Sequence, residues 1–181
     1  RAALFKGPDQ KRGIIKSIEN CEKIGAEFIA VPCNSVHYYY KDIVPHINIP
    51  WVNMIEITAK EARKKGQSPL ILGGLITVGK RLYSEYIPDA VYPTIMENDT
   101  IINAIEEIAL TSTLQEQSRE LVRKIILQYN GKVDSIILAC TELSIVFKNK
   151  YMLGLPVIDS NVEYAKEVVK LCQGRSKLRK N

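Results

Sequence analysis

Two cysteines stand in nearly the same sequence context, far apart in the chain. Cys33 ends the apolar run of GAEFIAVPCNSVH, and Cys140 ends that of KVDSIILACTELS. In both segments the cysteine is followed by small hydroxyl or amide side chains and then by the expected start of a helix. Two thiols in such matched settings can act on opposite faces of one substrate atom, one as a base and the other as an acid.

The surroundings of both cysteines suit the binding of a small anion. Ligands of open α/β sheets bind beyond the carboxyl ends of the strands, which is where both cysteines are expected. A helix N-terminus beside each thiol favours anions and can lower a thiol pKa from about 8.5 toward neutrality. Asn34, Ser35 and Thr141 supply short donors at the same place, as the binding of a carboxylate requires.

Other interpretations of the cysteines carry less weight. A single cysteine at a strand end is more often a small buried hydrophobic residue, but the second copy in the same context reverses that preference. Cys21 and Cys172 lie inside expected amphipathic helices and are assigned structural roles. A zinc site of Cys33, His37 and Cys140 is disfavoured because Cys-x3-His is not a standard spacing, and the chain has no Cys-x-x-Cys redox motif. We therefore predict no metal.

Apolar runs of a few residues alternate with longer amphipathic segments along the chain. This alternation is typical of βα units, and it predicts an α/β fold with mostly parallel sheets flanked by helices. Gly25 and Gly66 follow expected helices as C-caps do, and the segments from Thr113 and from Ser160 have the pattern of capping boxes. We expect strands over 27–31, 51–53, 69–73, 90–92, 133–139 and 156–158. We expect helices over 9–24, 36–43, 55–65, 78–86, 98–109, 113–128, 142–149 and 161–172.

The composition is that of a soluble globular protein, with 46% hydrophobic and 25% charged residues. The 181 residues can form one substantial domain or two small lobes that share a core. No apolar stretch approaches the roughly 18 residues needed to span a bilayer, and RAALFKGPDQ is not a signal peptide. We expect a cytoplasmic protein with reduced thiols. Much of the net charge of +5 lies in the tail GRSKLRKN, which we interpret as a solvated terminus.

The residues around both cysteines resemble the signature motifs of a known family. VPCNSVH at 31–37 and ACTELSIV at 139–146 resemble the two motifs of the PLP-independent aspartate/glutamate racemases, most closely the aspartate racemase branch. In that branch the motifs read Pro-Cys-Asn-Thr-Ala-His and Gly-Cys-Thr-Glu-Leu. The segments IPWVNMIEITAKEA, LILGGLITVGKRLY and LPVIDSNVEYAKEVV also have counterparts in the family.

The resemblance implies an isomerase, an amino-acid racemase without a cofactor that uses Cys33 and Cys140 as an acid/base pair at the substrate Cα. Without PLP as an electron sink, donors on the substrate carboxylate must stabilise the carbanion. The family likeness further implies a homodimer that acts on a small amino acid or dicarboxylic acid, with no nucleic acid or membrane as a partner. It assigns substrate binding to Arg1, Asn34, Ser35, Thr77, Thr141 and Glu142.

The resemblance also implies two pseudosymmetric α/β lobes with the active site in the cleft between them. The first lobe would comprise residues 1–48 and 152–181, and the second 49–151. Family members begin with a strand and a glycine-rich loop that this chain does not match, so we expect the N-terminal βα unit of the first lobe to be missing. Arg1 falls near the family arginine that pairs with the side-chain carboxylate of the substrate.

Two positions depart from the family pattern. Gly74 stands where the middle motif usually has threonine, although Thr77 remains. Leu110 stands where aspartate racemases have a lysine that contacts the side-chain carboxylate, so it favours a less acidic or even apolar substrate side chain. His37 is either a site residue or a packed helix residue. Two alternatives stay open: a related isomerase such as a maleate isomerase or hydantoin racemase, and a catalytically inactive binding protein of the same fold.

Overall fold

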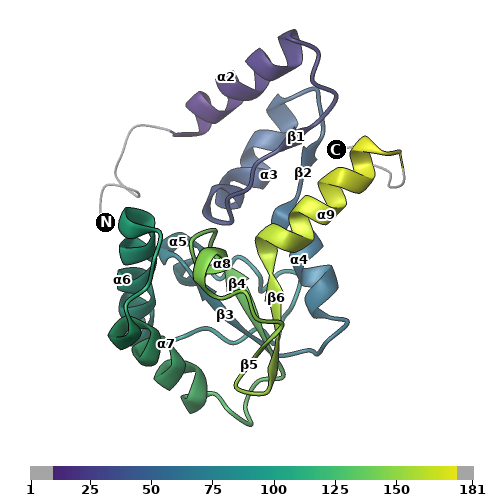
Figure 1. Ribbon diagram of the computed structural model, residues 1–181. Helices are drawn as coiled ribbons and strands as arrows, with labels where there is room; N and C mark the ends of the chain where they lie inside the picture. The colour runs from purple at the N-terminus through teal and green to yellow at the C-terminus, as the bar shows by residue number, and fades with distance from the viewer. Residues whose placement is uncertain (1–9, 175–181) are drawn as a thin grey trace.

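The computed structural model describes residues 10–174, which form two separate sheets (Figure 1). The first pairs β1 (Ile29–Ala30) with β2 (Trp51–Val52) in parallel. The second has the order β3-β4-β6-β5, in which β3 (Pro69–Gly73), β4 (Ser135–Ala139) and β6 (Leu155–Asp159) are parallel. The short β5 (Tyr151–Met152) is antiparallel to β6. Arg1 lies outside the described residues.

The second sheet is buried on both faces at β3 and β4, because these strands are almost entirely apolar. All five residues of β3 and of β4 are buried. Successive side chains of a strand point to opposite faces, so one face is packed by Leu70, Leu72 and Leu138 and the other by Ile71 and Ile137. The first face packs against α6 (Ile95–Thr111) and α7 (Glu116–Gln128), and the second against α4 (Met54–Ala62). This two-sided burial confirms the predicted α/β class with parallel sheets flanked by helices.

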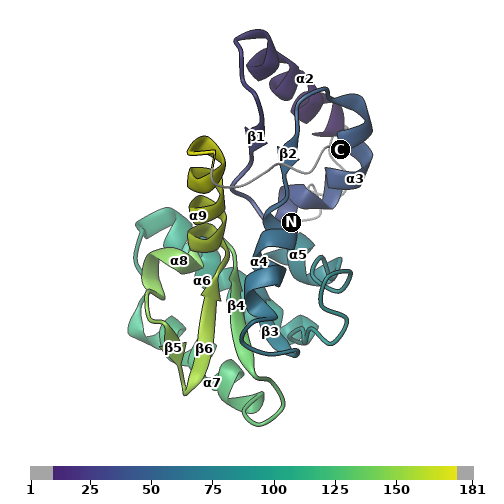
Figure 2. The same cartoon turned by 90° about the vertical axis from the view of Figure 1, so that its right-hand side faces the viewer.

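The remaining helices surround the first sheet and the junction between the two sheets (Figure 2). α2 and α3 lie beside β1 and β2, whereas α5 and α8 lie at the carboxyl edge of the second sheet. α9 begins directly after β6 and packs along α4. Their bounds are α2 (Gln10–Lys23), η1 (Ser35–Tyr39), α3 (Tyr40–Ile43), η2 (Val44–His46), α5 (Leu75–Gly79), α8 (Leu143–Val146) and α9 (Ser160–Cys172). Within the described part of the chain, no helix is long and apolar enough to cross a membrane.

The predicted elements are largely confirmed, with local corrections. The segment 78–86 is not a helix, because α5 ends at Gly79 and turns follow. The expected strand at 90–92 is a single bridge from Val91 to Leu70. Gly25 has a φ of 92° after α2, as a C-cap does. Gly66 has no positive φ; glycine is needed there because a Cβ would collide with the carboxylate of Asp134.

Both predicted capping boxes are wrong. α7 begins after Gln115, which makes no side-chain cap. α9 is capped by Asp159, whose carboxylate accepts the N–H groups of Asn161 and Val162, so Ser160 is left for other bonds. The observed capping box opens α6, where Thr94 and Glu97 cap each other.

The strand pairing bears on the predicted lobes. β2 falls after residue 48 but pairs with β1, and β6 falls after residue 151 but pairs with β4. By strand pairing, β2 therefore belongs with β1 of the predicted first lobe, and β6 belongs with β4 of the predicted second lobe. The division into 1–48 plus 152–181 and 49–151 stays a prediction.

Candidate active site

Cys33 lies in the short loop between β1 and η1, at the carboxyl end of the first sheet. The residue is partly buried. Its N–H donates to the carbonyl of Val31 at 2.8 Å. Its carbonyl accepts a hydrogen bond from His37 Nδ1, also at 2.8 Å. The backbone of Cys33 is thus held on both sides, and its side chain has access to solvent.

Cys140 is the first residue after β4 and is also partly buried. Its thiol donates to Glu142 Oε2 at 2.9 Å, and the hydroxyl of Thr141 donates to the same oxygen at 2.7 Å. Burial raises the pKa of Cys140, and the hydrogen bond to the Glu142 carboxylate and its charge raise it further. Cys140 therefore carries its proton at neutral pH.

This result corrects the expectation that a helix N-terminus lowers the thiol pKa at Cys140. α8 is only four residues long and begins at Leu143, and burial together with the nearby Glu142 carboxylate raises the thiol pKa instead. Burial alone raises the pKa of Glu142, but the hydrogen bonds from Cys140, Thr141 and its own backbone lower it by more. Glu142 is accordingly the charged member of the pair.

The two cysteines are close enough to interact electrostatically. A charge on Cys33 is one of the causes that raise the pKa of Cys140. Such an interaction falls off with distance, so Cys33 lies within range of the second thiol. The two cysteines follow β1 and β4, which belong to different sheets.

Asn34, predicted as a substrate-binding residue, is 3% exposed and forms bonds inside the protein. Its Oδ1 accepts the phenol hydrogen of Tyr83 at 2.6 Å, and its Nδ2 donates to Ser160 Oγ at 3.0 Å. Ser160 in turn donates to the carbonyl of Leu138 at 2.7 Å. Asn34 therefore connects the loop of Cys33 to the strand that leads to Cys140.

Ser35 and Thr77, both predicted to bind substrate, lie together. Their hydroxyl oxygens are 3.1 Å apart, and Thr77 is fully buried on α5. Because one hydroxyl donates to the other, the accepting hydroxyl keeps its own hydrogen for a further acceptor. A Cβ at Gly74 would lie 3.8 Å from Ser35 Oγ, an ordinary contact, so the glycine leaves room beside this pair.

His37 is a packed residue. It is 6% exposed, its Nδ1 bonds the carbonyl of Cys33, and its Nε2 accepts the N–H of Met54 at 3.0 Å. Because Nε2 is an acceptor, the proton must reside on Nδ1, and the ring is neutral. Burial lowers the pKa of His37, which agrees with this assignment. His37 therefore ties the Cys33 loop to the start of α4.

Leu110 lies near the end of α6 and is 87% exposed. It lines neither of the two cavities described below. That Leu110 faces a substrate side chain stays a prediction, as do the substrate-binding roles of the other assigned residues. Among residues 10–174, no group of three or more His, Cys, Asp or Glu side chains is placed to hold a metal ion.

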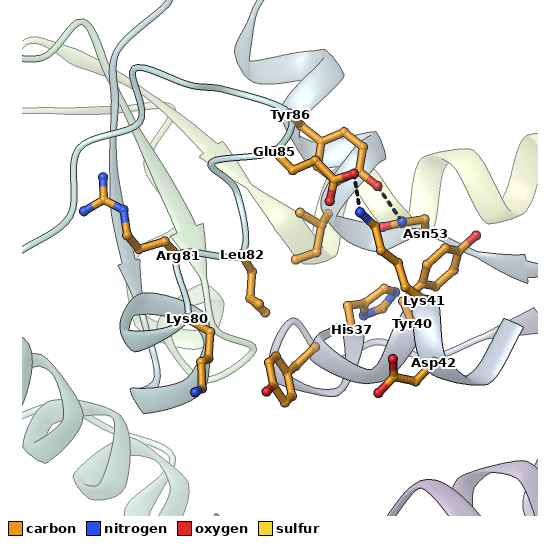
Figure 3. A pocket seen from close by; sticks show the side chains of 12 residues that line it. His37, Tyr40, Lys41, Asp42, Asn53, Lys80, Arg81, Leu82, Glu85 and Tyr86 are labelled. Atoms are coloured by element: carbon orange, nitrogen blue, oxygen red, sulfur yellow. Dashed lines mark hydrogen bonds and ion pairs between the residues drawn. The ribbon is translucent and has the colours of Figure 1, made fainter.

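Two cavities lie near the junction of the sheets. The first, of about 370 Å³, separates η1 and α3 from the turn at 80–86 (Figure 3). Its polar side chains pair across the gap: Lys41 Nζ lies 2.7 Å from Glu85 Oε1, and Asn53 Nδ2 donates to the hydroxyl of Tyr86 at 3.0 Å. The second, of about 430 Å³, is lined on one side by Pro32 and Thr141 together with α9. The second cavity therefore adjoins both cysteine loops.

Sequence reasoning missed Tyr83 and Ser160. Tyr83 falls in a segment expected to be a helix. The sequence of such a segment does not indicate that its tyrosine forms a hydrogen bond with a residue far away in the chain. Ser160 was assigned to a capping box, although the preceding Asp159 is a better N-cap by position. Because Asp159 caps the helix, the hydroxyl of Ser160 is available for another hydrogen bond. This order of residues is the one local sign of that bond in the sequence.

Comparisons with known proteins show the family and the fold of the chain. Residues 2–168 match the family described as Asp/Glu/Hydantoin racemase. The broad specificity amino-acid racemase RacX of Bacillus subtilis (strain 168) is 26% identical over 163 residues, which cover 89% of this chain and 71% of RacX. The aspartate racemase of Picrophilus torridus has a TM-score of 0.80 and 27% identity, over 99% of this chain and 75% of that one. An aspartate racemase homologue from Pyrococcus horikoshii OT3 has a TM-score of 0.76 and 25% identity, over 94% of this chain and 79% of that one. The chain belongs to the Asp/Glu/Hydantoin racemase family.

Proposed function

We propose that this protein is a PLP-independent amino-acid racemase in which Cys33 and Cys140 form the acid/base pair. The observation that supports the proposal is the placement of two partly buried thiols beyond strands of different sheets, in loops that adjoin one cavity through Pro32 and Thr141. A racemase must remove the α-proton from either enantiomer, so it needs a base on each face of Cα. Two thiols that approach one substrate from two sheets would meet that requirement.

The surroundings of the thiols support a division of labour in the resting enzyme. Cys140 carries its proton, held by Glu142, and acts as the acid. Cys33 then acts as the base: its thiolate takes the α-proton, and the Cys140 thiol gives its proton to the opposite face of the carbanion. The reverse reaction starts with the single proton on Cys33 and with Cys140 as the thiolate.

The carbanion must be stabilised at the substrate carboxylate, because no electron sink takes part in this scheme. The Ser35–Thr77 pair keeps one hydroxyl hydrogen that can be donated to that carboxylate. Thr141 and the Glu142 carboxylate lie beside the second sulfur, and we expect Glu142 to face the substrate ammonium group. The substrate class is a free amino acid. A homodimer and a cytoplasmic location complete the proposal.

The experiment that tests the reaction class is α-proton exchange in deuterated water without added PLP or metal. A set of L- and D-amino acids, including aspartate, glutamate and uncharged side chains, is followed by mass and by chiral analysis. Racemisation of at least one amino acid with uptake of solvent deuterium is expected. A 5-substituted hydantoin belongs in the same set, because the family description includes hydantoin racemase. Turnover of the hydantoin alone would contradict the amino-acid assignment.

Cysteine variants test the mechanism. Cys33→Ser and Cys140→Ser should each abolish racemisation, while each still exchanges the α-proton of one enantiomer, because one base remains on one face. The two variants should act on opposite enantiomers. Cys21→Ser and Cys172→Ser remove the other two thiols and serve as matched controls with unchanged racemisation. Equal residual racemisation in Cys33→Ser and Cys140→Ser would refute the two-base assignment.

A further inference from the structure

A chain of three buried side chains connects the two cysteine loops. Its donors and acceptors run in one direction, from the Tyr83 phenol to Asn34, from Asn34 to Ser160, and from Ser160 to the carbonyl of Leu138. Tyr83 and Ser160 are fully buried and Asn34 is 3% exposed. We propose that Tyr83, Asn34 and Ser160 are positioning residues that set the separation of Cys33 and Cys140. This inference rests on the proposed two-base reaction.

The direction of the chain follows from the number of hydrogens available. The hydroxyl of Ser160 has one hydrogen, which it donates to Leu138, so its oxygen must accept from the amide of Asn34. That bond fixes the orientation of the amide and turns Oδ1 toward Tyr83. Burial raises the pKa of Tyr83, so the phenol remains a donor at any pH near neutrality. Each bond therefore defines the next one.

The position of the chain explains why it controls the cysteines. Asn34 directly follows Cys33, and Leu138 lies two residues before Cys140 in β4. Within residues 10–174, β1 is two residues long and pairs with β2 alone, so backbone pairing between strands does not fix its loop on the second sheet. The bonds of Asn34 provide a link, the Ser35–Thr77 bond adds another to α5, and the Val31 N–H donates to Tyr164 on α9. Of these links, the bonds of Asn34 lie next to Cys33 and reach the strand that leads to Cys140.

A two-base reaction is sensitive to that gap. Both sulfurs must approach one carbon atom from opposite sides, and a misplacement of about 1 Å can reduce the rate about 100-fold. The network also separates two roles for Asn34. If Asn34 were a substrate ligand, removing the bonds that orient its amide would chiefly raise KM. If it is a positioning residue, the same changes at Tyr83 or Ser160 lower kcat and leave KM unchanged.

The test compares Tyr83→Phe and Ser160→Ala with matched controls. Each variant removes one hydroxyl of the network and keeps a buried side chain of nearly the same shape. Tyr129→Phe is the control for the phenol, since it removes a bond to Glu97 in the α6–α7 layer. Ser135→Ala is the control for the serine, because Ser135 is fully buried at the opposite end of β4. Urea unfolding gives the folded fraction of each variant, to which all rates are normalised.

We expect kcat for racemisation to fall by about 10- to 100-fold in Tyr83→Phe and in Ser160→Ala, with KM unchanged. The double variant should lose no more than the slower single variant, because both changes act through Asn34. The two controls should keep the kcat of the wild-type protein. Wild-type kcat in both network variants, or fully additive losses in the double variant, would overturn the inference.

A second readout does not depend on activity. In a Cys21→Ser/Cys172→Ser background, a short bifunctional thiol reagent should cross-link Cys33 to Cys140, and the rate should fall in both network variants but in neither control. If the wild-type protein racemises nothing, but cross-linking still falls in both network variants, the proposed function is refuted and the inference about the network stands. Unchanged cross-linking and unchanged kcat would refute the network and leave the proposed function intact. If Tyr83→Phe does not fold, Ser160→Ala carries the test alone.

Discussion

Glu142→Gln should lower the pKa of the Cys140 thiol by about one to three units. The substitution removes the negative charge whose oxygen lies 2.9 Å from Cys140 Sγ. Two unit charges about 4 Å apart interact by about 4 kcal/mol near a protein surface, and one pKa unit corresponds to about 1.36 kcal/mol. Partial exposure of the carboxylate reduces that energy. Glutamine keeps the size of the side chain and an oxygen that can accept the thiol hydrogen, so the change isolates the charge.

The thiol pKa can be read from the pH dependence of alkylation by iodoacetamide, with the modified Cys140 peptide quantified by mass spectrometry. The measurement is made in a Cys33→Ser background, so that the second site thiol does not titrate. Glu163→Gln is the matched control, because it removes a carboxylate that pairs with Lys166 on α9 and touches neither cysteine. An unchanged or higher Cys140 pKa in Glu142→Gln would refute the conclusion that Glu142 holds the proton on this thiol.

The same substitution should shift the pH profile of catalysis. In the proposed reaction the active form carries one proton on the cysteine pair, so the profile of kcat/KM is bell-shaped and reports the macroscopic pKa values of the pair. A lower Cys140 pKa stabilises the less protonated forms. The whole bell should therefore move to lower pH in Glu142→Gln, and the profile of Glu163→Gln should stay in place.

Three further predictions concern the scaffold. Because burial lowers the pKa of His37, the neutral ring contributes stability fully above about pH 6.5. That contribution is lost as the pH falls through the lowered folded-state pKa, so the urea midpoint should drop more steeply in acid for the wild type than for His37→Gln. Thr94→Ala should reduce the free energy of unfolding by about 0.5–2 kcal/mol, since it removes the N-cap of α6, and an unchanged urea midpoint would contradict the cap. Gly66→Ala should cost about 1–3 kcal/mol because its Cβ meets Asp134, whereas Gly79→Ala, with open space at its Cβ, should stay within about 0.5 kcal/mol of wild type.

The sequence predicts the second sheet well because its physical cause is local. Four or five consecutive apolar residues can be buried on both faces only in a covered parallel sheet, and the runs that end at Gly73 and Ala139 form such strands. The same reasoning places both cysteines at strand ends. Capping is harder to predict, because several residues near a helix start can serve as the cap. The sequence pattern favours Ser160 for α9, but the stronger acceptor Asp159 is the observed cap.

The hydrogen-bond network could not be predicted from the sequence. Tyr83, Asn34 and Ser160 are far apart in the chain, and each has a common alternative role in its own segment. Only the tertiary fold brings the residue before η1, the turn at 80–86 and the start of α9 together. A buried polar group must find a partner, but which partner it finds depends on the tertiary fold.

The two cysteine motifs look alike in sequence, and their surroundings differ. After Cys33, the side chain of Asn34 turns into the protein and connects the sheets. After Cys140, the carboxylate of Glu142 turns back to the sulfur and holds its proton. A two-base reaction tolerates this inequality, because its rate depends on the state in which the pair shares one proton and not on two equal individual pKa values. The repeated motif therefore predicts that each sulfur lies beyond the end of a strand. The residues that follow the two cysteines differ in what they do: Asn34 connects its loop to the second sheet, and Glu142 holds the proton on the other thiol.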